Sequence, residues 1–346
     1  MKKRQHYFIF FGFILTIYLS SINGDMLKSL KESPSGFIIE EKRIIIPGYP
    51  DAFNPSIIRW YDNKLLLIFR ARNKKNKKPN LIGFAWLDEK FEVTLPPILL
   101  TIYGENNRKL SRAQNPKLVR SGDIYYIAYN NIINNYDLET RRMVFSPLKY
   151  NGNQFYIENP EYLLNFPKDE ESWREKNWSP FDFNGTLLFS YRLNPHLVLQ
   201  PLMQNNECKE IASTEKKINW EWGEIHGGTP SILDDDHYLG FFHSWIDIKT
   251  EESTNEKISH YFIGAYCFEN KYPFELTHIS NTPIYSNNFY TSPTYKTWKP
   301  LKVVYPGGHV FDDHYIWVVY GKQDHECWVM KIDKQSLLNS LVPCRT

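Results

Sequence analysis

One pattern of hydrophobic and polar positions occurs five times along the chain. Each copy starts with a residue that directly precedes a proline and that is small and polar in most copies. A short apolar run follows, then a turn rich in Asp, Asn or Gly, and then a second apolar, aromatic-rich run that ends on a polar residue. Two apolar strands joined by such a turn are typical of a β-hairpin. The five copies are residues 54–70, 115–130, 179–192, 229–243 and 305–324.

The recurrence of this hairpin predicts a repeat fold. The interval between copies suits one four-stranded sheet with long loops, so the sequence predicts an all-β, five-bladed β-propeller. A β-sandwich with similar turns is the alternative. The chain has no Pro/Gly/Ser-rich linker, so we expect residues 25–346 to form a single domain, with residues 334–341 as a C-terminal cap or closing turn.

The first 24 residues have the order of charge and hydrophobicity typical of an export signal. A basic stretch at residues 2–4 precedes an apolar core at residues 7–19 and small or polar residues at 20–24. We expect cleavage after Gly24 and a secreted or periplasmic protein of the secretory pathway. Because Ile22 is unfavourable near a cleavage site, an uncleaved signal anchor is the alternative, and it would be the chain's only contact with a membrane.

Composition excludes several classes of protein. With 42% hydrophobic and 23% charged residues, the chain is an ordered globular protein. The net charge of +2 does not indicate a nucleic-acid partner, which requires a clustered basic face. The four cysteines lack metal-ligand spacing, so we expect no metal site, and they form either disulfides or buried thiols. The 16% aromatic content suits packing between blades and also stacking on sugar rings.

Polar residues stand at the ends of the repeated hairpins, where the loops of a propeller converge on its central channel. Together they would form a cationic, hydrogen-bonding pocket with few carboxylates. Structural bridging between blades is the alternative for the arginines. The candidates are Asn54, Arg70, Arg72, Arg112, Gln114, Asn115, Lys117, Lys176, Asn177, Arg192, His196, Glu224, His226, His243, His309 and Asp324.

Five landmarks, in order along the chain, carry a resemblance to a known family. They are AFNP and LLIFR at residues 52–55 and 66–70, EKNWSPF at 175–181, GGTP at 227–230, YFIGA at 261–265, and VYPGG at 304–308 leading to YGKQD at 320–324. Over residues 53–333 the chain resembles glycoside hydrolase family 130 and its relatives. These are five-bladed propellers that include β-mannoside phosphorylases, β-mannosidases and β-mannosyltransferases.

The resemblance implies hydrolysis, phosphorolysis or glycosyl transfer with inversion on β-mannosidic or related glycans. In that reaction one carboxylic acid protonates the glycosidic oxygen while water or phosphate attacks from the opposite face. It implies no cofactor, with phosphate as a potential co-substrate. Phosphate requires fixed cations, for which Arg70, Lys176, Arg192 and His243 are the candidates.

The chain departs from the family at the catalytic acid. Where the family has Glu-Asp-Pro-Arg, with Asp as the acid, residues 114–117 read Gln-Asn-Pro-Lys. An amide cannot donate a proton as a carboxylic acid does. The alternative to an active enzyme is therefore a catalytically impaired glycan-binding propeller, in which Asn115 still hydrogen-bonds a sugar hydroxyl.

Other residues offer partial compensation. Glu224, between the aromatic stretch at 220–222 and His226, could replace the lost acid if the aromatics raise its pKa, or it could simply pair with a cation. Asp324 is either a sugar-binding or a buried structural carboxylate. We expect His226 to contact a ligand, because Gly227 and Gly228 leave room for one to approach. The same reasoning applies, less strongly, to His309. His243 either contacts a ligand or is packed in the core.

Overall fold

The structure is a computed structural model that describes residues 27–72, 80–103, 113–135, 138–158, 160–163, 176–202, 207–249, 257–293, 295 and 301–345. Within these residues the chain is all-β, with a helical turn at residues 27–32, a short 3-10 helix, η1 (Tyr61–Asn63), and helix α2 (Lys334–Ser340), which lies where the C-terminal cap was predicted. The predicted export signal and Arg112 lie outside the described residues. Among the helices described, none has the length and apolar character of a membrane span.

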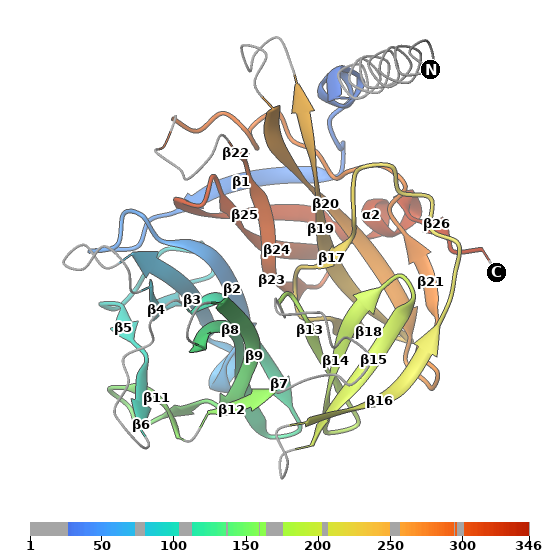
Figure 1. Ribbon diagram of the computed structural model, residues 1–346. Coiled ribbons are helices and arrows are strands. Elements are labelled where there is room, and N and C mark those ends of the chain that lie inside the picture. The colour runs from blue at the N-terminus through green and yellow to red at the C-terminus, as the bar shows by residue number, and fades with distance from the viewer. Residues whose placement is uncertain are drawn as a thin grey trace, which may run out of the picture.

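The first three large sheets each contain four strands (Figure 1). The first is formed by β2 (Phe53–Arg59), β3 (Leu65–Arg72), β4 (Asn80–Leu87) and β5 (Ile98–Leu99). The second is formed by β7 (Gln114–Ser121), β8 (Ile124–Asn135), β9 (Leu138–Pro147) and β12 (Glu161–Leu163). The third is formed by β13 (Ser179–Phe183), β14 (Thr186–Leu193), β15 (His196–Leu202) and β16 (Glu207–Thr214).

The remaining strands form two large sheets and one small sheet. The fourth sheet contains β17 (His226–Gly227), β18 (Ile232–Asp234), β19 (His237–Lys249), β20 (Lys257–Glu269), β21 (Leu276–Ile279), β22 (Leu301–Lys302) and β26 (Val342–Pro343). The fifth contains β23 (Val304–Asp312), β24 (Tyr315–Lys322), β25 (Glu326–Asp333) and β1 (Ile38–Ile44). The small sheet contains β6 (Thr101–Tyr103), β10 (Lys149–Tyr150) and β11 (Phe155–Glu158).

All five repeated segments form the predicted hairpins. The pairs β2–β3, β7–β8, β13–β14, β18–β19 and β23–β24 are antiparallel. Their turns contain left-handed residues, including Gly122, Asn184, Asp235 and Asp313. Gly, Asn and Asp tolerate this backbone conformation, which explains why the sequence places them between the two apolar runs.

The first strands of these hairpins pack against one another. Strand β2 lies between β23 and β7, and β7 also contacts β13. The approach of β23 to β2 requires glycine, because a Cβ at Gly307 would lie 1.8 Å from the Pro55 carbonyl oxygen, and one at Gly308 would lie 2.5 Å from the Ile57 nitrogen. The Gly-Gly pair is therefore a packing requirement of the centre of the molecule.

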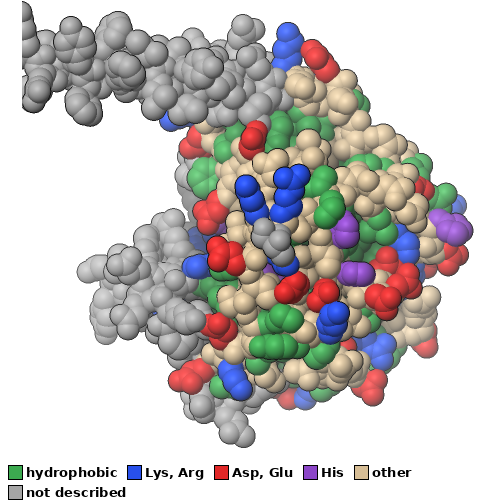
Figure 2. Space-filling view, turned by 90° about the vertical axis from the view of Figure 1, so that its right-hand side faces the viewer, with side chains coloured by type: hydrophobic (Ala, Val, Ile, Leu, Met, Phe, Trp, Pro, Cys, Tyr) green, Lys and Arg blue, Asp and Glu red, His purple; other side chains and the backbone are tan. Residues whose placement is uncertain are grey.

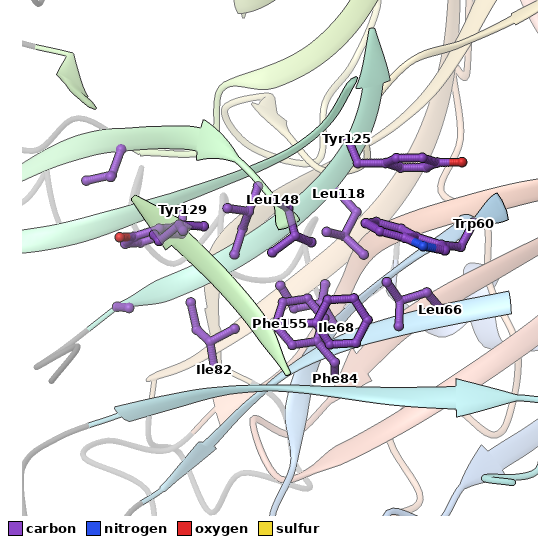
Figure 3. Packing of buried hydrophobic residues seen from close by; sticks show 14 of the residues in the cluster. Trp60, Leu66, Ile68, Ile82, Phe84, Leu118, Tyr125, Tyr129, Leu148 and Phe155 are labelled. Atoms are coloured by element: carbon purple, nitrogen blue, oxygen red, sulfur yellow. The ribbon is translucent and has the colours of Figure 1, made fainter. Parts of the chain in front are cut away.

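Aromatic side chains fill the space between the first and second sheets, as the composition predicts. The rings of Trp60 and Tyr125 are stacked with their centroids 3.9 Å apart, and those of Phe84 and Phe155 are stacked at 4.3 Å (Figure 3). These residues belong to one buried cluster that joins the two sheets. Hydrophobic packing between sheets therefore holds the hairpins in their relative positions.

The fifth sheet is completed by a strand from the beginning of the described chain. Strand β1 pairs with β25, from Ile38 opposite Ile332 to Ile44 opposite Cys327 (Figure 1). Glu41 accepts hydrogen bonds from the Tyr320 hydroxyl, at 2.8 Å, and from Ser286. The first strand of the described chain is thereby joined in one sheet to a strand close to its C-terminal end.

The described chain is not cross-linked by disulfides, and charge is not segregated on the face shown in Figure 2. All four cysteines are described and none of them forms a disulfide; Cys208, Cys267 and Cys327 are buried thiols, and Cys344 is partly exposed. Acidic and basic side chains are mixed on the face shown in Figure 2, with hydrophobic side chains among them.

Candidate functional site

A cavity of about 340 Å³ lies at the open end of the hairpins, away from their turns. Five of the predicted site residues line it, namely Lys176, Asn177, Arg192, Glu224 and His226. We call it the Lys176–His226 cavity. Glu224 is the only carboxylate lining it within the described part of the chain, so the cavity is predominantly cationic and polar, as the sequence predicts.

A pair of amides connects this cavity to the second sheet. The Asn115 Nδ2 donates a hydrogen bond of 2.8 Å to the Asn177 Oδ1. Both residues have left-handed backbone, with φ of 50° and 66°, and the β7–β8 register shifts at Asn115. Asparagine tolerates this conformation better than most residues, and such irregularities turn a side chain away from the regular alternation. Asn115, which the sequence resemblance aligns with the family's catalytic acid, is thus an amide bonded to another amide.

Lys117 lies behind this pair. It is 1% exposed, and its Nζ donates a hydrogen bond of 3.0 Å to the carbonyl oxygen of Trp178, next to Asn177. Burial lowers the pKa of Lys117 to about 7. The ammonium group therefore holds the backbone that positions Asn177 rather than opening into the cavity.

Two histidines adjoin the cavity from neighbouring strands. His226 on β17 is opposite His243 on β19, and their ring centroids are 5.6 Å apart. Burial lowers the pKa of His226, with Glu224 opposing and Lys176 adding to the effect. Burial, followed by His226, Lys176 and Lys117, lowers the pKa of His243 well below its ordinary value. Both imidazoles are thus neutral at pH 7 and offer one donor and one acceptor each.

Glu224 is exposed at the edge of the cavity. Its side chain is 85% accessible to solvent, and its Oε2 lies 3.8 Å from the His226 Nε2. The flanking tryptophans do not bury it: Trp222 packs against Phe262, and Trp220 against Phe242. The sequence suggested that aromatic side chains shield the Glu224 carboxylate. In the structure they do not, and the carboxylate is open to solvent.

A second polar group comes from the first and fifth sheets. Arg70 donates a hydrogen bond of 3.3 Å from Nη1 to the Asn54 Oδ1. Burial raises the pKa of Asp324, while Arg70, Arg72 and His325 oppose that shift. Burial lowers the pKa of Arg70 to about 10, against the attraction of Asp324. The structure thus brings Asn54, Arg70 and Asp324 together, as predicted.

Tyr305 and Tyr261 connect this group to the histidines. The Tyr305 ring centroid lies 4.9 Å from that of His243, and the Tyr261 ring stacks on His243. Burial raises the pKa of Tyr261 to about 12, with Asp324 contributing. Burial also raises the pKa of Tyr305, again with a contribution from Asp324.

Several buried polar atoms in this region have no hydrogen-bond partner among the residues that the structure describes. They are the Arg70 Nε, both amide atoms of Asn130, the His243 Nδ1 and the Tyr305 hydroxyl. Buried polar groups are normally paired, so such a concentration indicates a place for a polar ligand. Sequence reasoning missed Asn130 and Tyr305.

A signal for Asn130 was nevertheless present in the repeat. Asn130 is opposite Gln114 on β7, as Arg70 is opposite Phe53 on β2 and His243 is opposite His226. It is thus the last polar residue of its hairpin. No comparable signal identifies Tyr305, whose role depends on the packing of β23 against β19.

Two predicted histidines lie elsewhere. His196 is buried in the third sheet, where its ring is hydrogen-bonded to Ser190 and to the Phe274 carbonyl, and burial lowers its pKa to about 4. It is a structural residue. His309 lines a different cavity, at the turn end of the hairpins. Among the described residues no three His, Cys, Asp or Glu side chains are grouped to hold a metal ion.

The chain has no match among protein-family profiles or curated proteins. Solved structures do resemble it. A mannose phosphorylase from Leishmania mexicana, in complex with phosphate, has a TM-score of 0.62 at 10% identity, over 94% of this chain and 97% of that one. A GDP-Man-dependent mannosyltransferase from the same organism has a TM-score of 0.58 at 12% identity, over 89% and 94%.

A third structure comes from the GH130 family of mannoside phosphorylases, which contains glycoside hydrolases that target β-1,2-mannosidic linkages in Candida mannan. It has a TM-score of 0.59 at 12% identity, over 87% of this chain and 92% of that one. This chain has the GH130 fold. The resemblance seen in the sequence is confirmed for the fold, and the GH130 fold extends over nearly all of the described chain.

Proposed function

We propose that this chain is a five-bladed β-propeller that acts on a mannose-containing glycan in the Lys176–His226 cavity. Five large sheets each contain one copy of the repeated hairpin, which supports the blade count. The first strands β23, β2, β7 and β13 contact one another in succession, and the fourth sheet contacts its neighbours through β17 and β19. Structures with this fold include phosphorylases, hydrolases and a transferase of mannosides. The ligand class follows from these relatives and from the chemistry of the site.

The observation that carries the proposal is the set of unpartnered buried polar atoms on Arg70, Asn130, His243 and Tyr305. These residues do not themselves line the cavity; they adjoin it through His243, whose ring centroid lies 5.6 Å from that of the cavity-lining His226. They belong to different sheets and include donors and acceptors. A sugar, whose hydroxyl groups both donate and accept, would satisfy such a set. A compact apolar ligand would leave these atoms unpaired at a cost of about 1–3 kcal/mol each.

Glu224 is the acid that we propose for the reaction. In an inverting mechanism its carboxylic acid protonates the glycosidic oxygen as the bond from the anomeric carbon to that oxygen breaks. Water, phosphate or an acceptor hydroxyl forms the new bond from the opposite face. Lys176 and Arg192 line the same cavity and would hold an anionic phosphate there. The reaction requires no further cofactor.

Export of the chain through its N-terminal signal is part of the proposal. It gives a secreted or periplasmic protein, or one anchored by an uncleaved signal. Outside the cytosol, hydrolysis or transfer is favoured over phosphorolysis because a released sugar phosphate is of little use to the cell.

One observation favours a second candidate, glycan binding without turnover. The family's acid position is Asn115, and its Nδ2 is already engaged by the Asn177 Oδ1 at 2.8 Å. An amide in this position retains sugar binding but not proton donation. This binding protein would use the same cavity and the same unpartnered polar atoms.

The deciding experiment compares the wild type with Glu224→Gln in a turnover screen on β-mannosides and sugar nucleotides, with and without phosphate. We expect the variant to lose activity by about 100-fold or more, the usual contribution of a general acid. Glu221→Gln is the matched control, because Glu221 is exposed and does not line the cavity.

Two other outcomes are informative. Saturable glycan binding without turnover, together with activity gained in Asn115→Asp, would establish the binding protein. Absence of both binding and turnover in the folded wild type would overturn the proposed function altogether.

A further inference from the structure

A second cavity, of about 450 Å³, lies at the turn end of the repeated hairpins. Residues from β2, β7, β13, β18 and β23 all contribute to it, so it occupies the centre of the molecule at the end opposite the Lys176–His226 cavity. We call it the turn-side cavity. Its volume is in the range of small-molecule sites, which is about 300–1,000 Å³.

The walls of the turn-side cavity are mostly apolar. Aliphatic and aromatic side chains such as Ile57, Leu118, Ile232, Val310 and Phe311 line it. A sugar placed against these walls would lose the hydration of its hydroxyl groups without gaining partners, which is unfavourable. The two cavities therefore suit different kinds of ligand.

One polar side chain lies deep in the turn-side cavity without a partner. His309 is 1% exposed, and neither of its ring nitrogens has a hydrogen-bond partner in the described part of the chain. Its ring packs between Phe241 and Phe311, at centroid distances of 5.3 and 5.4 Å. Burial lowers its pKa to about 3, so the imidazole is neutral at pH 7 and presents one donor and one acceptor.

The charged side chains that line the same cavity already have hydrogen-bond partners within the protein. Arg59 donates to the carbonyl oxygens of Asn63 and Phe311, and Arg120 donates to the Gly122 carbonyl and to Asp123. These bonds lie at the hairpin turns.

Asp182 is engaged in the same way. Its carboxylate accepts hydrogen bonds from the Ser121 hydroxyl and from the backbone nitrogens of Gly122 and Gly185. These three charged side chains tie neighbouring turns together, so they do not mark an ionic ligand.

The turn-side cavity is separate from the Lys176–His226 cavity. No described residue lines both of them. Between the two ends, Gly307 and Gly308 on β23 pack directly against the backbone of β2 at Pro55 and Ile57. A ligand in one cavity therefore does not occupy the other.

We propose that the turn-side cavity binds an uncharged apolar molecule that has one hydroxyl group, with the hydroxyl on His309 and the hydrocarbon against the apolar walls. A hydroxyl group can donate to or accept from the neutral imidazole, whichever ring nitrogen faces it. A plain hydrocarbon would leave the imidazole unpaired. A carboxylate or ammonium would have to be dehydrated without a counter-ion, because the nearby charges are already paired.

Binding of 1-octanol to the full wild-type chain, measured by titration calorimetry, tests this proposal. We expect one saturable site, at least tenfold weaker binding of octanoate, and a change in the His309 ring signals in the NMR spectrum on adding octanol. A β-mannoside should not displace the octanol. Absence of saturable octanol binding, or competition by the mannoside, would overturn the proposal.

Two variants test the location of the site. Leu233→Asp introduces a charge at the cavity mouth, where Leu233 is 44% exposed, and should weaken octanol binding at least tenfold. Leu99→Asp is its control, since Leu99 is a similarly exposed strand leucine that does not line the cavity, and should bind octanol as the wild type does. Equal affinities in both variants and the wild type would place the octanol elsewhere.

His309→Phe tests the polar anchor. It keeps an aromatic ring of similar size but removes both ring nitrogens, so octanol should bind about tenfold more weakly. Unchanged affinity in this variant would show that His309 does not receive the hydroxyl group.

Discussion

At the scale of single residues, Lys117 shows that the site is supported by an energetically costly group. Its ammonium is buried with one hydrogen bond to the Trp178 carbonyl, and burial lowers its pKa from 10.5 to about 7. Each unit of such a shift corresponds to about 1.4 kcal/mol. Folding is therefore penalised at every pH at which the unfolded chain keeps this lysine protonated.

Lys117→Met should stabilise the fold in a pH-dependent way. Below pH 7 the lysine is protonated in both states and the penalty is complete. Between about pH 7 and 10.5 the unfolded state binds more protons, so the wild type's free energy of unfolding rises with pH and the penalty shrinks. We expect a gain of about 2 kcal/mol at pH 6 in urea unfolding, and a clearly smaller gain at pH 9.

The control is Lys64→Met, at a lysine whose side chain is 65% exposed. It should change the free energy of unfolding little at either pH. Equal gains for Lys117→Met at pH 6 and pH 9 would contradict the explanation from burial.

The sequence predicted the site residues better than their surroundings. Lys176, Asn177, Arg192, Glu224 and His226 could be gathered in advance because each stands at the end of a repeated hairpin or directly before one. Their exposure could not be read from the sequence. Glu224 has aromatic neighbours in the chain, but the Trp220 ring packs against Phe242 and the Trp222 ring against Phe262, and the Glu224 carboxylate stays exposed.

At the scale of elements, backbone irregularities within the strands determine the arrangement of the hairpins as much as the apolar runs do. The Asn-Pro steps at 54–55 and 115–116 coincide with shifts in strand register, where left-handed asparagines turn their side chains toward the site. The apolar runs and turns predicted the strands themselves. The register shifts were not predicted, because they depend on contacts between strands of different sheets.

Gly307→Ala tests the packing of β23 against β2. The new Cβ would lie 1.8 Å from the Pro55 carbonyl oxygen, a contact with backbone that only a shift of one strand can relieve. We expect a loss of about 3 kcal/mol in the free energy of unfolding, measured by urea denaturation. Gly36→Ala, where nothing lies within 4 Å of the new atom, should be nearly neutral. A neutral effect at Gly307 would mean that the two strands are not held in this contact.

At the scale of the whole molecule, the fifth sheet joins the first strand of the described chain to a strand close to its C-terminal end. Residues 38–44 read Ile-Ile-Glu-Glu-Lys-Arg-Ile, without the apolar–polar alternation that identifies a half-buried strand in a sequence. Their partner, β25, lies almost 300 residues away in the sequence, and no local pattern identifies it. The repeat therefore predicted five hairpins but not which strand completes the fifth sheet.

Glu41→Ala should weaken this closure. Without the carboxylate, the Tyr320 hydroxyl loses its acceptor in a fully buried position, and Ser286 loses its own. We expect a loss of about 1–3 kcal/mol in the free energy of unfolding, measured by thermal or urea denaturation. Glu40→Ala, at the exposed neighbouring position, should have little effect. An equal loss in both variants would assign the effect to the strand itself rather than to the hydrogen bonds.

The pairing of β1 with β25 also sets an order of events during synthesis. The ribosome makes β1 first and its partner β25 near the end, so the fifth sheet cannot form until almost the whole chain has emerged. A prematurely terminated chain would leave β1 without a partner and the fifth sheet unfinished, with open strand edges that proteases can attack. Contacts over so many residues also slow folding, so this sheet is expected to be among the last parts of the molecule to become protected.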